Sequence, residues 1–345
     1  MHHLDRTVTA PTGTDQRPVP SIPPIAHFVW LGPQLPDLAW LAIASAQRRG
    51  GFSSVRLWCE PTVLKIDNSV NVLRDAGLQL YDLADLDREA TTQTDELRLR
   101  HLCASLPSPA ARADVWRLRI VRAHGGVYLD SDAIVLRSFA PLLSFSTFVG
   151  LEYVALPAAL YASKNPLRWA RAAALLAVRH AIALRQGAGQ RFAKVAVHFH
   201  LSCNNAVFGA EIAAPMVQAL CTAAAQLPAE QASRLYELGP RLWERQTGNR
   251  STPATGAVPC EVLPPHAFYP LGPEICADYV AHDPHRQLGD VPDPLAYAAH
   301  VYDSVVQRRL GRPIDLAWLQ AHTRTTLLGR MVADLVPELV SARGR

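Results

Sequence analysis

The stretch 110–137 constrains the fold of this chain more than any other part of the sequence. Its first half has the spacing of a helix and ends at Gly125-Gly126, where glycine is favoured after a helix. The short apolar run 127–129 predicts a buried strand, and Asp130 and Asp132 come directly after it. Because α/β sheets bind ligands beyond the carboxyl ends of their strands, these two carboxylates are placed to hold a divalent metal or sugar hydroxyls.

The rest of the chain alternates between strand-like and helix-like segments. Apolar runs typical of strands lie at 25–31, 54–59, 78–81 and 147–151, and an extended segment lies at 198–209. Helical patterns lie at 38–49, 62–76, 85–103, 165–186, 213–226 and 315–342. Such alternation predicts an α/β fold with a mostly parallel sheet flanked by helices, followed by a helical C-terminal region at about 313–345.

The domain organisation expected from the sequence is simple. Residues 1–24 are rich in threonine, proline and polar residues without periodicity, which predicts a disordered N-terminal tail. No repeat or linker follows, so we expect residues 25–345 to form a single domain. The segment 237–289 is rich in proline and glycine and predicts turns with one strand near 258–263.

Composition argues against several classes of function. A net charge of +4 on 345 residues gives no support for general nucleic-acid binding, so we expect no nucleic-acid partner. The six cysteines form no Cys-x-x-Cys pair, which argues against a thiolate zinc site and favours free thiols. The sequence has no apolar run long enough for a membrane span and no secretory signal, so we expect a cytoplasmic protein, with export by a signal-independent route left open.

The stretch 110–137 resembles the DXD-type sugar-binding region of retaining glycosyltransferases with the GT-A fold. This group includes the glucosylating domains of large clostridial toxins, the initiating mannosyltransferases of yeast and α-1,4-galactosyltransferase-like enzymes. Bacterial effector N-acetylglucosaminyltransferases that modify arginine share parts of the pattern. Four other segments are similar, in the same order, to the first strand, an Asn-x-x-x-x-Gly-Ala stretch, a Gly-Pro turn and a C-terminal His-x-Trp element of these enzymes: 27–33, 205–210, 238–242 and 300–303.

This resemblance implies a GT-A-type sheet and a metal-dependent retaining transfer of a hexose from a UDP- or GDP-sugar. The acceptor (protein, glycan, lipid or small metabolite) is not identified by the sequence. By similarity, Asp132 binds Mn²⁺ or Mg²⁺ directly and Asp130 reaches it through water while contacting hydroxyls of the ribose or sugar. His300, or Asp303 beside it, completes the metal shell. The metal would act as a Lewis acid on the pyrophosphate leaving group.

The same resemblance assigns the residues around the donor. Asp114 and Arg117 match positions that orient the donor sugar, with Ala113 where serine is common, and they join Asp130 and Asp132 as catalytic candidates. Trp30 matches the position whose indole stacks on the base. The remaining donor-binding candidates are His27, Val29, Tyr128 and Asn205.

On position alone, Glu152 and Asn205 are candidates for the acceptor side. No enzymic nucleophile is evident, which favours a front-face mechanism without a covalent intermediate. Tyr302 stands where the related enzymes often have tryptophan.

Each candidate also has a purely structural interpretation. Asp130 and Asp132 suit a polar turn, and Asp114 with Arg117 an exposed ion pair on a helix. Trp30 suits a core position and His300 a structural histidine.

Two other functions stay open at this point. A haloacid-dehalogenase-type phosphatase also has Asp-x-Asp after a buried strand, although it places the motif early in its fold. The other is a catalytically silent sugar-binding module; the presence of all four catalytic candidates argues against it, because an inactive module need not keep them.

Overall fold

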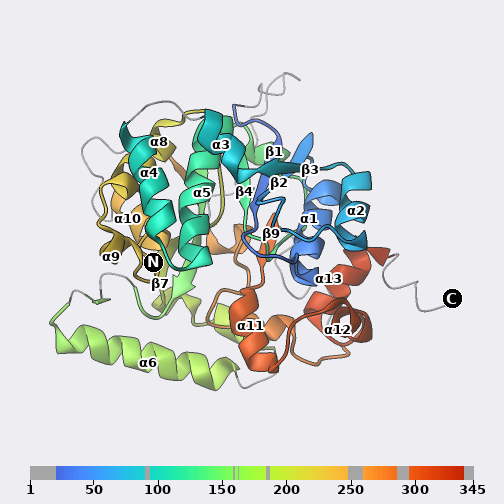
Figure 1. Cartoon of the computed structure of the whole chain (residues 1–345). Helices are drawn as coiled ribbons and strands as arrows, with labels where there is room; N and C mark the ends of the chain where they lie inside the picture. Colours follow the sequence, from blue (N-terminus) through green and yellow to red (C-terminus); the bar gives the residue numbers. More distant parts are fainter. Residues whose placement is uncertain are drawn as a thin grey trace, which may run out of the picture.

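The computed structural model of the chain describes residues 21–89, 94–157, 160–161, 163–183, 187–247, 259–285 and 295–337. Its centre is a seven-stranded sheet with the order β3-β2-β1-β4-β7-β6-β8 (Figure 1). The strands are β1 (Ile25–Val29), β2 (Ser54–Cys59), β3 (Leu78–Asp82), β4 (Gly126–Leu129), β6 (Thr147–Val154), β7 (His200–Ala210) and β8 (Glu261–Leu263). A separate pair consists of β5 (Ala133–Val135) and β9 (Ala298–His300).

Most of the neighbouring strands run parallel. β3, β2, β1 and β4 are parallel to one another, and β8 is parallel to β6. β7 is antiparallel to both of its neighbours, β4 and β6. The prediction of an α/β fold with a mostly parallel sheet is confirmed.

Helices cover both faces of the sheet. One face packs against α1 (Asp37–Arg49), α2 (Asn68–Asp75) and α13 (Leu327–Leu335), and the other against α4 (Thr94–Ser105), α5 (Pro109–His124), α8 (Pro215–Ala225) and α10 (Pro240–Thr247). The remaining helices are α3 (Leu83–Glu89), α6 (Pro166–Ala183), α7 (Ala188–Ala193), α9 (Ala229–Ala232), α11 (Asp303–Leu310) and α12 (Leu316–Ala321). Two apolar cores therefore lie on opposite sides of strands that are themselves buried, as their apolar sequences predict.

The double glycine lets α5 turn directly into β4. Gly125 has φ +61° and Gly126 has φ +93°, a region that residues with a side chain rarely adopt. A Cβ atom on Gly126 would lie 2.6 Å from the carbonyl oxygen of Ile25 in the neighbouring strand. The glycine pair thus serves both the turn and the close approach of β4 to β1.

Three local predictions need correction. The N-terminal tail was expected to extend to residue 24, but Ile22 is fully buried and its amide donates to Leu143 O at 2.9 Å; residues 1–20 lie outside the described residues. The expected single helix 315–342 is two helices, because the chain breaks after Ala321 and the Thr326 side chain caps α13. Helix α10 forms inside the proline- and glycine-rich segment where only turns and a strand were expected.

Two other expectations fall within the described part of the chain. Cys59, Cys103, Cys221 and Cys276 are buried and form no disulfide, in agreement with free thiols. Of the helices in the described ranges, none has both the length and the apolar character needed to cross a bilayer.

Candidate active site

A cleft of about 1370 Å³ opens beyond the carboxyl ends of β1 and β4. Most of the predicted site residues line it: Val29, Trp30, Asp114, Arg117, Tyr128, Asp130, Asp132, Glu152, Asn205, His300 and Asp303. They come from β1, α5, β4, β6, β7, β9 and α11 and from the turns that follow β1 and β4. The fold therefore gathers residues that are widely separated in sequence.

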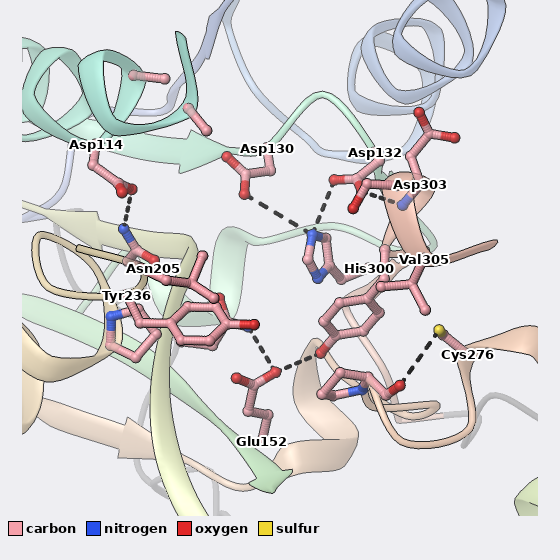
Figure 2. A pocket seen from close by; sticks show the side chains of 18 of the residues that line it. Asp114, Asp130, Asp132, Glu152, Asn205, Tyr236, Cys276, His300, Asp303 and Val305 are labelled. Atoms are coloured by element: carbon pink, nitrogen blue, oxygen red, sulfur yellow. Dashed lines mark hydrogen bonds and ion pairs between the residues drawn. The ribbon is translucent and has the colours of Figure 1, made fainter. Parts of the chain in front are cut away.

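Asp130, Asp132 and His300 form a compact group on one wall of the cleft (Figure 2). The ligand atoms of these three side chains lie within 4.8 Å of one another. His300 Nε2 is 2.9 Å from Asp132 Oδ1 and 3.9 Å from Asp130 Oδ2. The antiparallel pairing of β5 with β9 sets Ala133 opposite His300, which brings the imidazole beside the two carboxylates.

The electrostatics of this group separate the two carboxylates. Burial raises the pKa of Asp130; Arg117 opposes this rise and Asp132 adds to it. Burial also acts to raise the pKa of Asp132, but the charge and hydrogen bond of His300 outweigh it, so that pKa is lowered. The pKa of His300 is raised, because its carboxylate neighbours outweigh the effect of burial. The raised pKa of His300 and the lowered pKa of Asp132 both favour the ion pair between these two side chains.

Arg117 links the carboxylate group to the rest of the cleft. Its side chain is buried, and Nη2 lies 3.2 Å from Asp114 Oδ1 and 3.1 Å from Asp130 Oδ1. Nη1 donates to the backbone oxygen of Asn205 at 2.8 Å, and the guanidinium lies over the Tyr128 ring at 4.5 Å. Such a fully engaged guanidinium is unlike the exposed ion pair considered from the sequence.

Asn205 and Tyr128 complete the hydrogen bonds around Arg117. The Asn205 side-chain amide donates to Asp114 Oδ1 at 2.8 Å, and Tyr128 OH donates to Asp130 Oδ1 at 2.8 Å. The bond from Asn205 orients Asp114. The bond from Tyr128 orients Asp130, whose other oxygen faces His300. Asn205 therefore lies with the donor-side candidates.

The turn 300–303 provides a backbone contact where a side-chain ligand was expected. The Asp303 amide donates to Asp132 Oδ2 at 2.8 Å, whereas its own carboxylate accepts from Gln307 Nε2 at 2.6 Å. The Asp303 carboxylate is not part of the compact group described above. Tyr302 has φ +58°, a strained conformation for a bulky side chain that directs this turn into the cleft. The structure therefore favours His300 over Asp303 as the third candidate ligand.

Glu152 lies across the cleft from Asp130 and Asp132 (Figure 2). It is buried, and its Oε2 accepts from Tyr302 OH at 2.7 Å and from Asn204 Nδ2 at 2.8 Å. Burial raises the pKa of Glu152, and these two hydrogen bonds oppose the rise. Asn204 and Tyr302 were not among the predicted site residues, although both adjoin positions that were.

The two residues taken from the first strand have different surroundings. Trp30 lines the cleft, and its buried Nε1 has no hydrogen-bond partner among the described residues. His27 does not line the cleft; it is fully buried, with Nε2 2.9 Å from Gly125 O and Nδ1 accepting from Trp58 Nε1 at 3.1 Å. The assignment of His27 to the donor is therefore corrected to a core position, because His27 lies in the middle of β1 whereas the cleft opens beyond the carboxyl end of that strand.

Residues 59–149 match a family described as the glycosyltransferase sugar-binding region containing a DXD motif. Among solved structures, the chain is similar to the PaToxG glycosyltransferase at 13% identity, covering 65% of this chain and 68% of that one with a TM-score of 0.41. It is also similar to the UDP-bound glycosyltransferase domain from the YGT toxin, at 12% identity over 70% of this chain and 79% of that one, with a TM-score of 0.39. No curated protein matches. The family match includes Asp114, Arg117, Asp130 and Asp132, and it confirms the interpretation of 110–137 as a DXD-containing sugar-binding region.

Proposed function

We propose that this glycosyltransferase is metal-dependent and retaining, and that it moves a hexose from a UDP- or GDP-sugar to an acceptor. The observation that carries the proposal is the convergence of Asp130, Asp132 and His300 on one wall of the cleft, directly beside the Arg117 network. A polar turn does not require a buried imidazole from a distant strand at 2.9 Å from one of its carboxylates.

The three side chains fit a divalent cation. Carboxylate oxygens suit Mg²⁺ and Mn²⁺, and one imidazole nitrogen is compatible with Mn²⁺. Asp132 and His300 would hold the ion, which would take the place of the proton that His300 Nε2 shares with Asp132, and Asp130 would contact it through water. When bound, the ion supplies charge neutralisation for a diphosphate leaving group.

The remaining residues orient the donor. Asp114 is held by Arg117 and Asn205, so its free lone pairs are fixed in direction and suit hydroxyls of the donor sugar. Trp30 lies after β1 at the edge of the cleft and presents an aromatic ring on which a nucleotide base stacks. Val29 and Tyr128 line the same wall.

We propose that the transfer retains the anomeric configuration by a front-face mechanism, in which the acceptor attacks the face of the sugar from which the diphosphate leaves. Glu152 lies on the far side of the cleft and receives hydrogen bonds from Tyr302 and Asn204 on Oε2 alone. We assign Glu152 to the orientation of the acceptor hydroxyl, while the departing diphosphate receives the acceptor proton.

We also propose that the protein acts in the cytoplasm.

The test is donor hydrolysis with a panel of nucleotide sugars and Mn²⁺, measured as released nucleotide. We expect Asp132→Asn to lower the rate by roughly 100- to 1,000-fold, as for the loss of one preorganised electrostatic group, and EDTA to abolish activity. Asp303→Asn is the matched control, and we expect it to stay within about threefold of the unmodified chain because the Asp303 backbone, not its carboxylate, contacts Asp132.

Equal losses in the two variants would return Asp303 to the ligand set. Release of phosphate from simple phosphate esters, without turnover of any nucleotide sugar, would replace the proposal with the phosphatase alternative.

A further inference from the structure

Helix α6 lies along one edge of the molecule, apart from the central sheet (Figure 1). Only Ala172 and Leu175 of this helix are buried. Its opposite side, here called the outer face of α6, is exposed and mostly apolar, with Arg171 and His180 as its polar residues; its apolar members are Leu167, Ala170, Ala173, Ala174, Ala177, Val178 and Ala181. Leu167 is 77% exposed and Val178 40%. A surface helix normally turns such a face inward, so the composition indicates a surface that a partner covers.

The charged residues of the sequence segment that contains α6 are all basic. Between Glu152 and Glu211 the sequence contains no aspartate or glutamate and seven basic residues: Lys164, Arg168, Arg171, Arg179, Arg185, Arg191 and Lys194. This segment alone carries more positive charge than the net +4 of the whole chain. A concentration of one sign on one segment indicates an anionic partner.

An apolar groove of about 220 Å³ adjoins the outer face of α6. Leu175 and Val178 of α6 form one side with Ala174 and Arg171, and Val195 and Phe199 form the other with His198. Beyond it, Val197 is 78% exposed and Leu201 43%. The apolar surface thus extends from the helix to the segment that leads into β7.

We propose that the outer face of α6 docks on an anionic lipid bilayer. An amphipathic helix of this kind lies in the membrane interface, with its apolar side chains among the acyl chains and its basic residues at the headgroups. Trp169, 42% exposed at the start of α6, is a side chain typical of that interface. A second copy of the chain is a poorer partner, because it would bring a second all-basic segment against the first.

Docking at this face would also orient the cleft. Arg179 and His180 of α6 also line the cleft, and Arg179 forms an ion pair with Glu274. Resting on the proposed glycosyltransferase function, this geometry points to an acceptor presented at the membrane surface.

The test is sedimentation of the full chain with vesicles of phosphatidylcholine alone or mixed with phosphatidylserine. We expect binding to the mixed vesicles only, weakened by salt as charges are screened. The double variant Leu167→Glu with Val178→Glu should bind at least about 25-fold more weakly, because each unit of charge at an anionic surface changes partitioning about fivefold.

The matched control is Val63→Glu with Val72→Glu, which changes two exposed valines near α2, on another part of the surface. We expect it to bind vesicles like the unmodified chain. Neither pair lines the cleft, so donor hydrolysis without vesicles should stay unchanged in both. That assay reports separately whether the chain is a glycosyltransferase.

Equal binding to neutral and anionic vesicles would overturn the proposal, as would vesicle binding that survives the α6 double variant. A third outcome is that the chain binds no vesicles but self-associates, and that the α6 double variant is monomeric. This result would instead identify the outer face of α6 as an interface between copies.

Discussion

Arg117 connects the groups proposed to bind the sugar with those proposed to bind the metal. Its guanidinium contacts Asp114 and Asp130 and the backbone of Asn205, while its plane rests on Tyr128. A lysine has neither the fork of donors nor the flat face that these contacts use. The pKa of Arg117 is raised because Asp130, Tyr128 and Asp114 outweigh the effect of burial, so the cation persists although it is buried.

At the same scale, the variant Trp30→Ala distinguishes a role for Trp30 in base stacking from a role in core packing. We expect Trp30→Ala to weaken the binding of UDP or GDP in the presence of Mn²⁺ by about 1–3 kcal/mol, since that is the contribution of one base stacked on an aromatic ring. Isothermal titration calorimetry measures the change, and Trp169→Ala, outside the cleft, is the control. Unchanged affinity in Trp30→Ala would make Trp30 a core residue.

At the scale of elements, the junction of α5 and β4 carries Asp114, Arg117, Asp130 and Asp132 to one place. The helix presents the first pair one turn apart, and the strand delivers the second pair at its carboxyl end. Gly126 makes the junction short, because its backbone conformation and its contact with Ile25 leave no room for a side chain.

This junction gives a stability prediction with an internal control. Gly77 has φ +98°, close to the +93° of Gly126, but a Cβ on Gly77 would meet nothing within 4 Å. We expect Gly77→Ala to lower the free energy of unfolding by about 1–2 kcal/mol through backbone strain alone. Gly126→Ala should cost about 1–3 kcal/mol more, because its Cβ would overlap Ile25 O and His27 Nε2. Urea unfolding measures both; equal losses would show that β4 and β1 separate easily.

At the scale of the whole molecule, His27 ties the sheet to the end of α5. The ring accepts from Trp58 of β2 at Nδ1 and is hydrogen-bonded to Gly125 O through Nε2, which suits the neutral ring protonated on Nε2. Burial and the nearby Arg56 lower the pKa of His27 to about 3. A proton on Nδ1 would break the bond from Trp58.

The stability of the chain should therefore fall in mild acid. The unfolded chain takes up a proton on His27 below about pH 6.5 whereas the folded chain does so only near pH 3, so stability is full above pH 6.5 and is lost as the pH falls toward 3. At pH 5 the loss due to His27 is about 2 kcal/mol. Denaturant unfolding at pH 7.5 and pH 5 measures it, and His27→Gln should remove this part of the pH dependence. An unchanged pH dependence in His27→Gln would assign the acid sensitivity to other groups.

The sequence by itself determined most of the elements and the DXD centre, although it missed α10 and merged α12 with α13. Apolar runs, the double glycine and the Asp-x-Asp spacing are local signals, because strand burial, helix ends and turns depend on neighbours in the chain. They were sufficient to predict β1, α5, β4 and the placement of Asp130 and Asp132 beyond a strand, while the resemblance to DXD glycosyltransferases added the roles of Asp114 and Arg117.

Only the tertiary structure decided how distant residues meet. The pairing of β5 with β9 brought His300 to Asp132, and the strained Tyr302 turn supplied the backbone rather than the carboxylate of Asp303. The packing around β1 placed His27, in the middle of the strand, in the core, but left Trp30, directly after the strand, at the cleft. The exposed apolar side of α6 also became visible only when its buried side was known. Long-range strand pairing and side-chain direction follow from how the whole chain packs, and a single sequence records these only indirectly.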